Sequence, residues 1–435
     1  MDFLNFIKES KTMYHACNTI SKILDDNNFI KLNENEKFNL ELGKNYYFTR
    51  NNSSVIAFKL PKKLDDLSFN ISAAHLDSPT FKLKPNFEID LNRYQMLNTE
   101  VYGGPIYSTF MDRPLDIAGR VLIKDNNKII TKLFSFDKPV CMIPNLCIHF
   151  NRNANTEMNL NPQKDMLPLF MDKEISKYDL KELISNKLNC KKEDIYGYDL
   201  FLSLIDRGTY VGFNNEFIMA PQIDNLECSY VSVMSLIKSK IKDGTIDILA
   251  LFDNEEIGSH TRQGAQSDMV LNTLRRITDS FNLSNEEHLC AINNSFFVSL
   301  DNAQGFHPNY PDKYDSTNRC YLNEGIVIKN AASGSYTTDG LSLSIFKEIC
   351  EKANAKYQFT TNRSDIRGGS TLGAILLSKI SIPAVDIGLA QLSMHSAYET
   401  CGSLDIDELM KAMIKYNETH FHFNGDKEVE LKWVM

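Results

Sequence analysis

Short apolar runs alternate with longer segments of helical spacing through the second half of the chain, and this alternation restricts the fold more than any other feature. The apolar runs are TIDILALFD (245–253), SFFVSLD (295–301), EGIVIKN (324–330) and IPAVDIGLA (382–390). The segments with helical spacing are 226–241, 266–282, 339–353 and 370–380. Strands that are apolar on both faces are typical of parallel sheets covered by helices. The sequence therefore predicts an α/β fold whose central sheet is mostly parallel and flanked by helices.

The first half of the chain adds further strands and a region of different texture. Residues 1–30 have the spacing of one amphipathic helix, and β-like runs follow, ending with LSFNISAAH (67–75). Between Phe81 and Phe217, turn signals such as Gly-Gly-Pro and Asp-Arg-Pro separate short β-like pieces. We expect a β-rich domain inserted into the α/β domain. The predicted boundaries are 1–85 and 219–435 for the two parts of the α/β domain and 86–218 for the insert.

Bulk properties narrow the class of protein. The chain of 435 residues has a net charge of −9 and scattered lysines, which argues against nucleic acid and anionic membranes as partners. No apolar stretch reaches about 18 residues, and the amino-terminal segment lacks the residue order of a signal peptide. Nine cysteines without a CxxC pair favour reduced thiols over a disulfide framework. We expect a cytoplasmic enzyme.

Polar side chains stand where the predicted strands end. In open α/β sheets the reactive groups lie beyond the carboxyl ends of the strands, so these side chains are expected to meet at one edge. They are His75 and Asp77 after one strand, Glu255 and Glu256 after another, Asp301, His395, and Asp224 just before a helix. Histidine nitrogens and carboxylate oxygens are ligands of catalytic zinc. A single residue of this kind more often caps a helix or is solvated, but their joint occurrence favours a metal site.

Two adjacent glutamates at the tip of a core strand need an explanation, because adjacent carboxylates repel each other. In a site with two metals roughly 3.5–4 Å apart, one carboxylate can coordinate while its neighbour faces the bridging water. The positive charge of the two metals offsets the repulsion. We therefore predict that Glu256 binds metal and that Glu255 transfers protons.

Several segments are similar to the aspartyl aminopeptidase family, a group of cocatalytic dizinc exopeptidases. They occur in the family order between residues 73 and 402. The segments are AAHLDSPTFKLKP, MDRPLDIAGRV, IPNLCIHFNRNAN, FIMAPQIDNLECSY, FDNEEIGSHTRQGA, DNAQGFHPNY, EGIVIKN, DIRGGSTLGA and QLSMHSAYET. The resemblance implies a zinc exopeptidase-like α/β catalytic domain with an inserted β-rich dimerisation domain, and dimers that assemble into a dodecamer.

The resemblance also implies which residues hold metal. One zinc would be bound by His75, Asp224 and Glu256. The other would be bound by Asp224, Asp301 and His395, so that Asp224 bridges the two ions. Two Zn²⁺ ions per subunit are expected, with Co²⁺ or Mn²⁺ as alternative metals.

Three further roles follow from the same resemblance. Asp77 would orient His75 and fix its tautomer, and Glu255 would act as the general base. His149 would reach across the dimer and stabilise the oxyanion formed in the partner's site. The competing interpretation of His149, on a β-like piece of the insert, is an ordinary surface or interface residue.

The segment after Asp301 departs from the family pattern. Family members usually read DMAHAxHPN where this chain reads DNAQGFHPN, so Asn302 and Gln304 replace Met and His while His307 is kept. The departure bears on substrate contacts, to which His307 is assigned, more than on metal binding. Lys329 matches a family lysine linked to acidic selectivity, and a surface lysine paired with an acid is the alternative. We expect a preference for amino-terminal Asp or Glu.

The leading interpretation is a metal-dependent aminopeptidase that releases single residues from the amino termini of peptides. The alternative within enzymes is a deacylase of N-acyl amino acids on the same two-zinc scaffold. The alternative outside enzymes is a noncatalytic cargo or assembly protein with a structural metal site. Such a protein would have no use for Glu255, which is not a predicted ligand, so its presence favours an enzyme.

Overall fold

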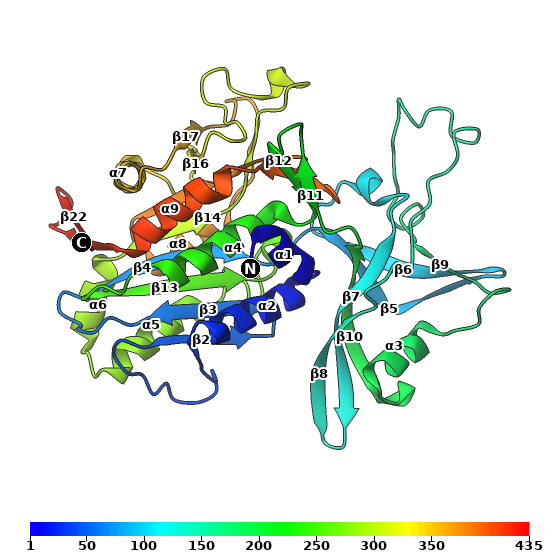
Figure 1. The fold of residues 1–435 in the computed structure, drawn as a ribbon, viewed down its shortest axis with the longest axis horizontal. Helices are drawn as coiled ribbons and strands as arrows, with labels where there is room; N and C mark the ends of the chain where they lie inside the picture. Colours follow the sequence, from blue (N-terminus) through cyan, green and yellow to red (C-terminus); the bar gives the residue numbers. More distant parts are fainter. Residues whose placement is uncertain (435) are drawn as a thin grey trace.

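A mixed sheet through the centre of the molecule carries helices on both faces (Figure 1). The computed structural model describes residues 1–434, and within this range nine strands form the central sheet. In spatial order they are β1 (Ile30–Lys31), β2 (Asn45–Arg50), β3 (Ser54–Lys59), β13 (Thr245–Phe252), β4 (Ser68–His75), β14 (Phe296–Leu300), β18 (Ala384–Gly388), β16 (Ile326–Lys329) and β17 (Tyr357–Thr360). The neighbours β13, β4, β14 and β18 run parallel to one another, so their carboxyl ends meet at one edge. The predicted α/β class is confirmed.

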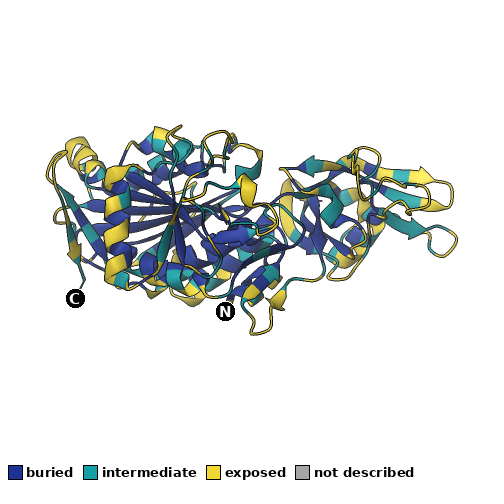
Figure 2. Cartoon of the chain, turned by 90° about the horizontal axis from the view of Figure 1, so that it is seen from above, coloured by how far each residue is buried: buried dark blue, intermediate teal, exposed yellow. Residues whose placement is uncertain are grey.

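Helices pack on both faces because successive residues of a strand point to opposite sides. On β13, Leu249 and Leu251 join the apolar core of one face, whereas Ile248 and Ala250 join the core of the other. The helices of the first face are α1 (Phe3–Glu9), α2 (Met13–Asp26), α4 (Ile223–Lys238), α7 (Gly340–Ala353) and α9 (Asp405–Asn417). Those of the second face are α5 (Met269–Ser280), α6 (Asn285–Asn293) and α8 (Leu372–Ile380). The central strands are consequently buried between two helical layers (Figure 2).

The amino-terminal segment is not the single helix that its periodicity predicts. Helix α1 ends at Glu9, and Ser10 leaves the helical conformation before α2 begins. The guanidinium group of Arg207 donates hydrogen bonds to the carbonyl oxygens of Ile7, at 2.6 Å, and Ser10, at 3.0 Å. These bonds satisfy carbonyl groups that a continuous helix would have bonded internally. The break therefore depends on a residue about 200 positions away, which local periodicity does not report.

A second, antiparallel sheet projects from one side of the central sheet (Figure 1). In spatial order its strands are β8 (Lys128–Ser135), β7 (Leu115–Asp125), β10 (Ile195–Leu204), β5 (Thr80–Leu91), β6 (Tyr94–Tyr102) and β9 (Leu169–Asp172). With α3 (Leu180–Leu188) it encloses an apolar core of its own, including Phe81, Ile117 and Leu200. The chain enters this sheet after β4 and leaves it before α4. Its first strand begins at Thr80, ahead of the predicted limit at residue 86.

A smaller sheet begins where the chain leaves the second sheet and returns to the α/β domain. Its strands, in spatial order, are β11 (Thr209–Val211), β12 (Phe217–Ala220), β20 (Glu399–Gly402), β19 (Ala390–Leu392) and β15 (Ala303–Gln304). The pairing of β12 with β20 brings the start of α4 beside the segment that follows β19. A hairpin of β21 (Thr419–Phe423) and β22 (Val429–Trp433) ends the described chain. Within residues 1–434, none of the helices has the length and apolarity needed to cross a lipid bilayer.

Candidate active site

Five residues predicted to bind metal meet at the carboxyl edge of the central sheet. His75 is the last residue of β4, Asp301 follows β14, and Glu256 lies in the short turn after β13. Asp224 comes from the first turn of α4, and His395 from the loop after β19. Because β4, β13 and β14 are parallel neighbours, their ends deliver side chains to the same place.

The carboxylate of Asp224 lies between two groups of ligand atoms. Its Oδ1 is 3.4 Å from Nε2 of His75, which is also 3.5 Å from Oδ1 of Asp301. Its Oδ2 is 3.6 Å from Nε2 of His395, which is also 3.4 Å from Oε2 of Glu256. Each set of three offers ligand atoms within 4.8 Å of one another. The site therefore consists of two donor sets that share Asp224.

The short contacts pair these residues differently from the ligand sets that the family resemblance implied, and those sets stay a prediction. The same five residues are involved, but Nε2 of His75 lies 3.5 Å from Asp301 and Nε2 of His395 lies 3.4 Å from Glu256. The reason is topological: β4 and β14 are adjacent, so His75 and Asp301 leave the sheet side by side. Glu256 lies beyond the end of β13, on a turn that carries it toward the loop of His395. His75 also forms a third set of possible ligands with Glu255 and Glu256.

The donor chemistry of the cluster fits zinc. Imidazole nitrogens and carboxylate oxygens are zinc ligands, and buried carboxylates are costly unless a positive charge compensates them. Oδ1 of Asp224 is buried and accepts no hydrogen bond within the described chain, so it is free to coordinate. A divalent cation would satisfy this oxygen and offset the repulsion among the surrounding carboxylates.

Backbone carbonyl oxygens fix the tautomer of both histidines. Nδ1 of His75 is 3.1 Å from the carbonyl oxygen of Asp77, and Nδ1 of His395 is 3.1 Å from that of Gly104. A carbonyl oxygen only accepts, so each Nδ1 carries a proton, and each Nε2 is the nitrogen that faces Asp224 and could bind a metal ion. Such partners orient metal-binding imidazoles. Asp77 therefore orients His75 through its backbone more closely than through its carboxylate, which lies at 3.4 Å.

Burial and neighbouring charges shift the pKa values of the clustered acids in different directions. Burial raises the pKa of Glu255 to about 8, with the carboxylates of Asp301 and Asp77 adding to the effect and His75 opposing it. Burial and the Asp224 carboxylate raise the pKa of Glu256 well above its usual value. Burial acts in the same direction on Asp224, but its contacts with His395 and His75 prevail and lower its pKa. Metal binding displaces protons from such ligands.

Nearly the whole sequence matches a known protein family. The family model described as "Aminopeptidase I zinc metalloprotease (M18)" covers residues 6–416. A "Probable M18 family aminopeptidase 2" of Clostridium novyi is 45% identical over 408 residues, which are 92% of this chain and 94% of that protein. The protein belongs to the M18 aminopeptidase family. It is accordingly a metal-dependent aminopeptidase, a zinc hydrolase, as its sequence predicted.

Other M18 relatives extend the likeness to remote organisms and to the fold. The "Aspartyl aminopeptidase" of Dictyostelium discoideum is 34% identical over 463 residues, covering 96% of both chains. A chain in the cryo-EM structure of an Ape4 and Nbr1 complex superimposes with a TM-score of 0.92 at 31% identity, covering 95% of this chain and 84% of that one. The S. cerevisiae mApe1 dodecamer gives a TM-score of 0.82 at 26% identity, covering 95% and 94%.

Of the two residues assigned to substrate, Lys329 lies beside the M18 metal cluster and His307 does not line the same cavity. Lys329 is buried, its Nζ donates to the carbonyl oxygen of Asn302 at 2.8 Å, and it is 3.7 Å from Oδ2 of Asp301. Lys329 and Asp301 line a cavity of about 230 Å³. Nδ1 of His307 instead accepts a hydrogen bond from the backbone of Asn309.

His149 is not among the residues of its own chain that form the candidate metal site or line the cavity beside Lys329. It lies in an exposed turn of the second sheet rather than on a β-like piece, beside Phe150, of which 83% is exposed. Leu146 and Ile148 are exposed on the same segment. The action of His149 in the site of a second subunit stays a prediction.

Asn302, one of the two departures from the family pattern, makes its contacts inside the protein. The side chain of Asn302 is buried, and its Nδ2 donates to Oε2 of Glu227 at 2.7 Å. Burial raises the pKa of Glu227 to about 8. The Asn302 amide nitrogen therefore faces Glu227 of α4, although Asn302 and the exposed Gln304 both line the cavity beside Lys329.

Sequence reasoning missed residues that hold the ligands in place. Oε2 of Glu399 accepts a hydrogen bond from the backbone of Asp224 at 2.9 Å, and Oε1 accepts one from the backbone of His395 at 2.7 Å. One carboxylate thus joins the two chain segments that meet at the shared ligand. Glu399 lies only four residues beyond His395 in QLSMHSAYET, but no local pattern assigns it this contact. Tyr102, whose hydroxyl donates to Oδ2 of Asp77 at 2.8 Å, was missed for the same reason.

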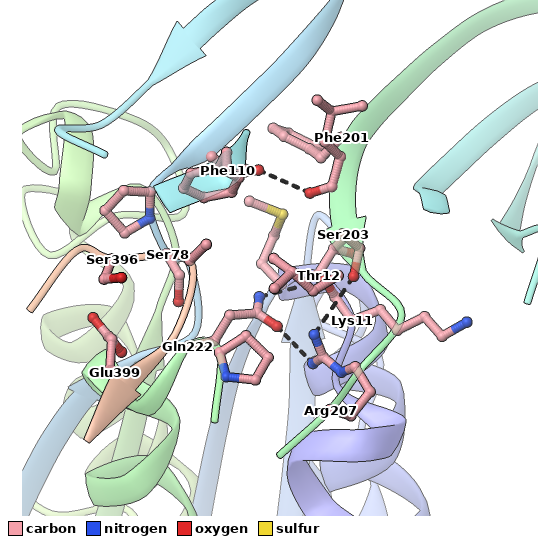
Figure 3. A pocket seen from close by; sticks show the side chains of 17 residues that line it. Lys11, Thr12, Ser78, Phe110, Phe201, Ser203, Arg207, Gln222, Ser396 and Glu399 are labelled. Carbon is pink, nitrogen blue, oxygen red and sulfur yellow. Dashed lines mark hydrogen bonds between the residues drawn. The ribbon is translucent and has the colours of Figure 1, made fainter. Parts of the chain in front are cut away.

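Glu399 also lines a small cavity (Figure 3). Ser78 and Glu399 stand on one side of it, and Arg207 and Gln222 on the other. Its volume of about 30 Å³ suffices for one or two water molecules and not for a substrate side chain. The cavity beside Lys329 is larger, at about 230 Å³, and is lined by Asp301 of the candidate metal site.

Proposed function

We propose that this M18 aminopeptidase holds two zinc ions through the two donor sets and removes amino-terminal residues with Glu255 as general acid and base. One set is His75, Asp224 and Asp301, and the other is Asp224, Glu256 and His395. The observation that carries the proposal is the shared carboxylate of Asp224, whose two oxygens each face a different histidine. A bridging carboxylate of this kind is typical of sites with two metals.

The residues divide the chemistry between them. Zinc in these sets supplies Lewis-acid polarisation of the scissile carbonyl and lowers the pKa of a water molecule. Glu255 takes the proton of the attacking water and delivers it to the leaving amine nitrogen as the C–N bond breaks. Its side chain is 18% exposed, against 5% for Glu256, so solvent and substrate reach it. Its Oε2 lies 4.0 Å from Nε2 of His75, further than the carboxylates of the His75 donor set.

The cavity beside the cluster favours a substrate with an acidic first residue. The ammonium group of Lys329 is buried at its wall, and a relative sharing 34% of its residues is named an aspartyl aminopeptidase. Placing an acidic side chain near a buried ammonium compensates both charges. We therefore expect peptides that begin with Asp or Glu to be the preferred substrates.

Assembly completes the proposed enzyme. A relative of 26% identity forms a dodecamer, and exposed apolar residues surround His149 on the second sheet. We infer that residues 86–218 act as the dimerisation domain, that dimers build a dodecamer, and that His149 acts in the partner's site. The nine cysteines are all free thiols, which supports a reducing compartment, the cytoplasm.

A combined assay tests the proposed function. Zinc content is measured by elemental analysis while turnover is followed on aminoacyl-anilides with free and with N-acetylated α-amines. We expect two zinc ions per chain and cleavage of the free-amine series alone. Cleavage confined to the acetylated series would indicate a deacylase instead. A protein that binds zinc and cleaves neither series would contradict the assigned chemistry.

A further inference from the structure

The segment that ends β6 belongs to the second sheet, yet it touches the metal-binding residues at several points. The hydroxyl of Tyr102 donates to Oδ2 of Asp77 at 2.8 Å. The carbonyl oxygen of Gly104 accepts from Nδ1 of His395, and the backbone nitrogen of Ile106 donates to the carbonyl oxygen of His395 at 2.9 Å. Residues 102–106 therefore contact both the strand end that carries His75 and the loop that carries His395.

The Tyr102 hydroxyl occupies the middle of a chain of hydrogen bonds. It accepts from Nδ2 of Asn254 at 2.9 Å and donates to the carboxylate of Asp77. That carboxylate also accepts from the backbone nitrogens of Glu255 and Glu256, both at 3.1 Å. One tyrosine oxygen of the second sheet thus supports the carboxylate that fixes the backbone of both glutamates.

Packing holds this oxygen in place. The Tyr102 ring is buried and meets the ring of Phe201 edge-on, with centroids 5.4 Å apart. The next residue, Gly103, has a φ of +70°, and a methyl group there would lie 3.1 Å from Cβ of Glu256. Glycine at this position permits the close approach of the second sheet to the metal ligand. The geometry of the contact is therefore set by backbone as well as by side chains.

We propose that Tyr102 is a positioning residue for the metal centre, which it supports through Asp77 from the second sheet. This inference rests on the proposed function and deepens it. The contact between the second sheet and Asp77 would be needed to keep the zinc-binding residues in position. Removing a partner that orients a metal ligand typically lowers metal affinity or activity about 10–100-fold. Tyr102 does not line the substrate cavity, so its contribution should fall on zinc binding and on kcat rather than on KM.

The direct test is Tyr102→Phe, which removes one oxygen and keeps the ring. Zinc affinity is measured by competition with a chromophoric chelator, and the absorption spectrum is recorded with Co²⁺ in place of zinc. We expect zinc affinity to fall about 10–100-fold, the cobalt spectrum to shift, and kcat to fall with KM unchanged. Wild-type zinc affinity together with an unchanged cobalt spectrum would overturn the proposal.

Tyr47→Phe is the matched control. Tyr47 is also buried, and its hydroxyl donates to Oδ1 of Asp25 at 2.7 Å, away from the metal cluster. Both variants lose a tyrosine–aspartate hydrogen bond, so a merely structural effect would be common to both. We expect Tyr47→Phe to keep the zinc affinity and cobalt spectrum of the wild type. Equal losses of zinc affinity in the two variants would overturn the proposal.

A double-mutant cycle with Asp77→Asn tests whether Tyr102 acts through Asp77. If it does, Tyr102→Phe/Asp77→Asn binds zinc as weakly as Asp77→Asn alone. Additive losses would overturn the proposed route. The zinc and cobalt measurements need no turnover, so they decide on Tyr102 even if the wild type cleaves no aminoacyl-anilide. That last result would count against the proposed function alone.

Discussion

Glu255 and Glu256 are adjacent in the chain, yet their carboxylates have different surroundings. The Glu256 side chain is almost fully buried and faces His395, whereas the Glu255 side chain is partly open and faces the His75 side. The backbone nitrogens of both residues donate to the carboxylate of Asp77. The backbone is therefore held at one point, from which the two side chains extend in different directions. This arrangement supports one ligand and one proton carrier.

Replacing Glu255 by glutamine should separate metal binding from chemistry. Glu255→Gln keeps the shape of the side chain and loses the base, so we expect wild-type zinc content and a fall in kcat of about 10²–10⁴-fold. Zinc analysis and initial rates provide the measurement, and Glu286→Gln, an exposed glutamate of α6, is the control. Turnover near that of the wild type would remove Glu255 from the mechanism.

Lys329 should set the charge preference of the cavity. Loss of a charge-assisted contact with an acidic substrate corresponds to about 1.5–3 kcal/mol, or about 10–100-fold in kcat/KM. We therefore expect Lys329→Ala to lower the ratio of Asp to Leu cleavage by that factor. Lys313→Ala is the control, because Lys313 lines the same cavity but is largely exposed. Faster cleavage of Leu than of Asp substrates by the wild type would contradict the assignment.

At the scale of elements, Asp386 of β18 joins two loops that line the substrate cavity. Its Oδ2 accepts from the backbone nitrogen and the hydroxyl of Thr337, and its Oδ1 accepts from the hydroxyl of Thr371 at 2.7 Å. Thr371 is the N-cap of α8, and Tyr336, next to Thr337, lines the cavity. A buried carboxylate in the sheet therefore fixes the cavity wall.

Asp386→Ala should loosen both loops without reaching the metal ligands. Hydrogen bonds to a buried charge contribute strongly, so we expect the free energy of unfolding to fall by about 3 kcal/mol. KM should rise while zinc content stays constant, as measured by denaturant unfolding, steady-state kinetics and elemental analysis. Ser284→Ala, which removes the capping box of α6, should cost about 1 kcal/mol and leave KM unchanged. An unchanged KM in Asp386→Ala would show that the loops do not shape the substrate site.

At the scale of the whole molecule, His149 is predicted to donate to the oxyanion in the site of another chain. A donor aimed at the oxyanion contributes about 3–4 kcal/mol, so His149→Ala and Glu255→Ala should each be nearly inactive. Co-assembled subunits of the two variants should regain activity, since some dimers contain one site with both residues intact. Mixed assemblies, verified by mass, are compared with each parent for turnover. Mixed assemblies as inactive as their parents would exclude the role in trans.

The residues at the strand ends could be predicted from the sequence because their placement is a property of the strands. His75, Glu256 and Asp301 follow apolar runs that fold as parallel neighbours, and the carboxyl ends of such strands share one edge. The adjacent glutamates Glu255 and Glu256 follow one of these apolar runs, so they also indicated a metal site from the local sequence. The α/β class and the candidate ligand residues follow from patterns a few residues long.

Only the tertiary structure decided how those residues are grouped and what supports them. His75 groups with Asp301 because β14 lies beside β4, an order that strand sequences do not encode. The contact of Gly104 with His395 joins residues 291 positions apart, and that of Arg207 with Ile7 breaks a helix from 200 positions away. These contacts join segments that are far apart in the chain. The periodicity of a sequence records only residues that are close along the chain.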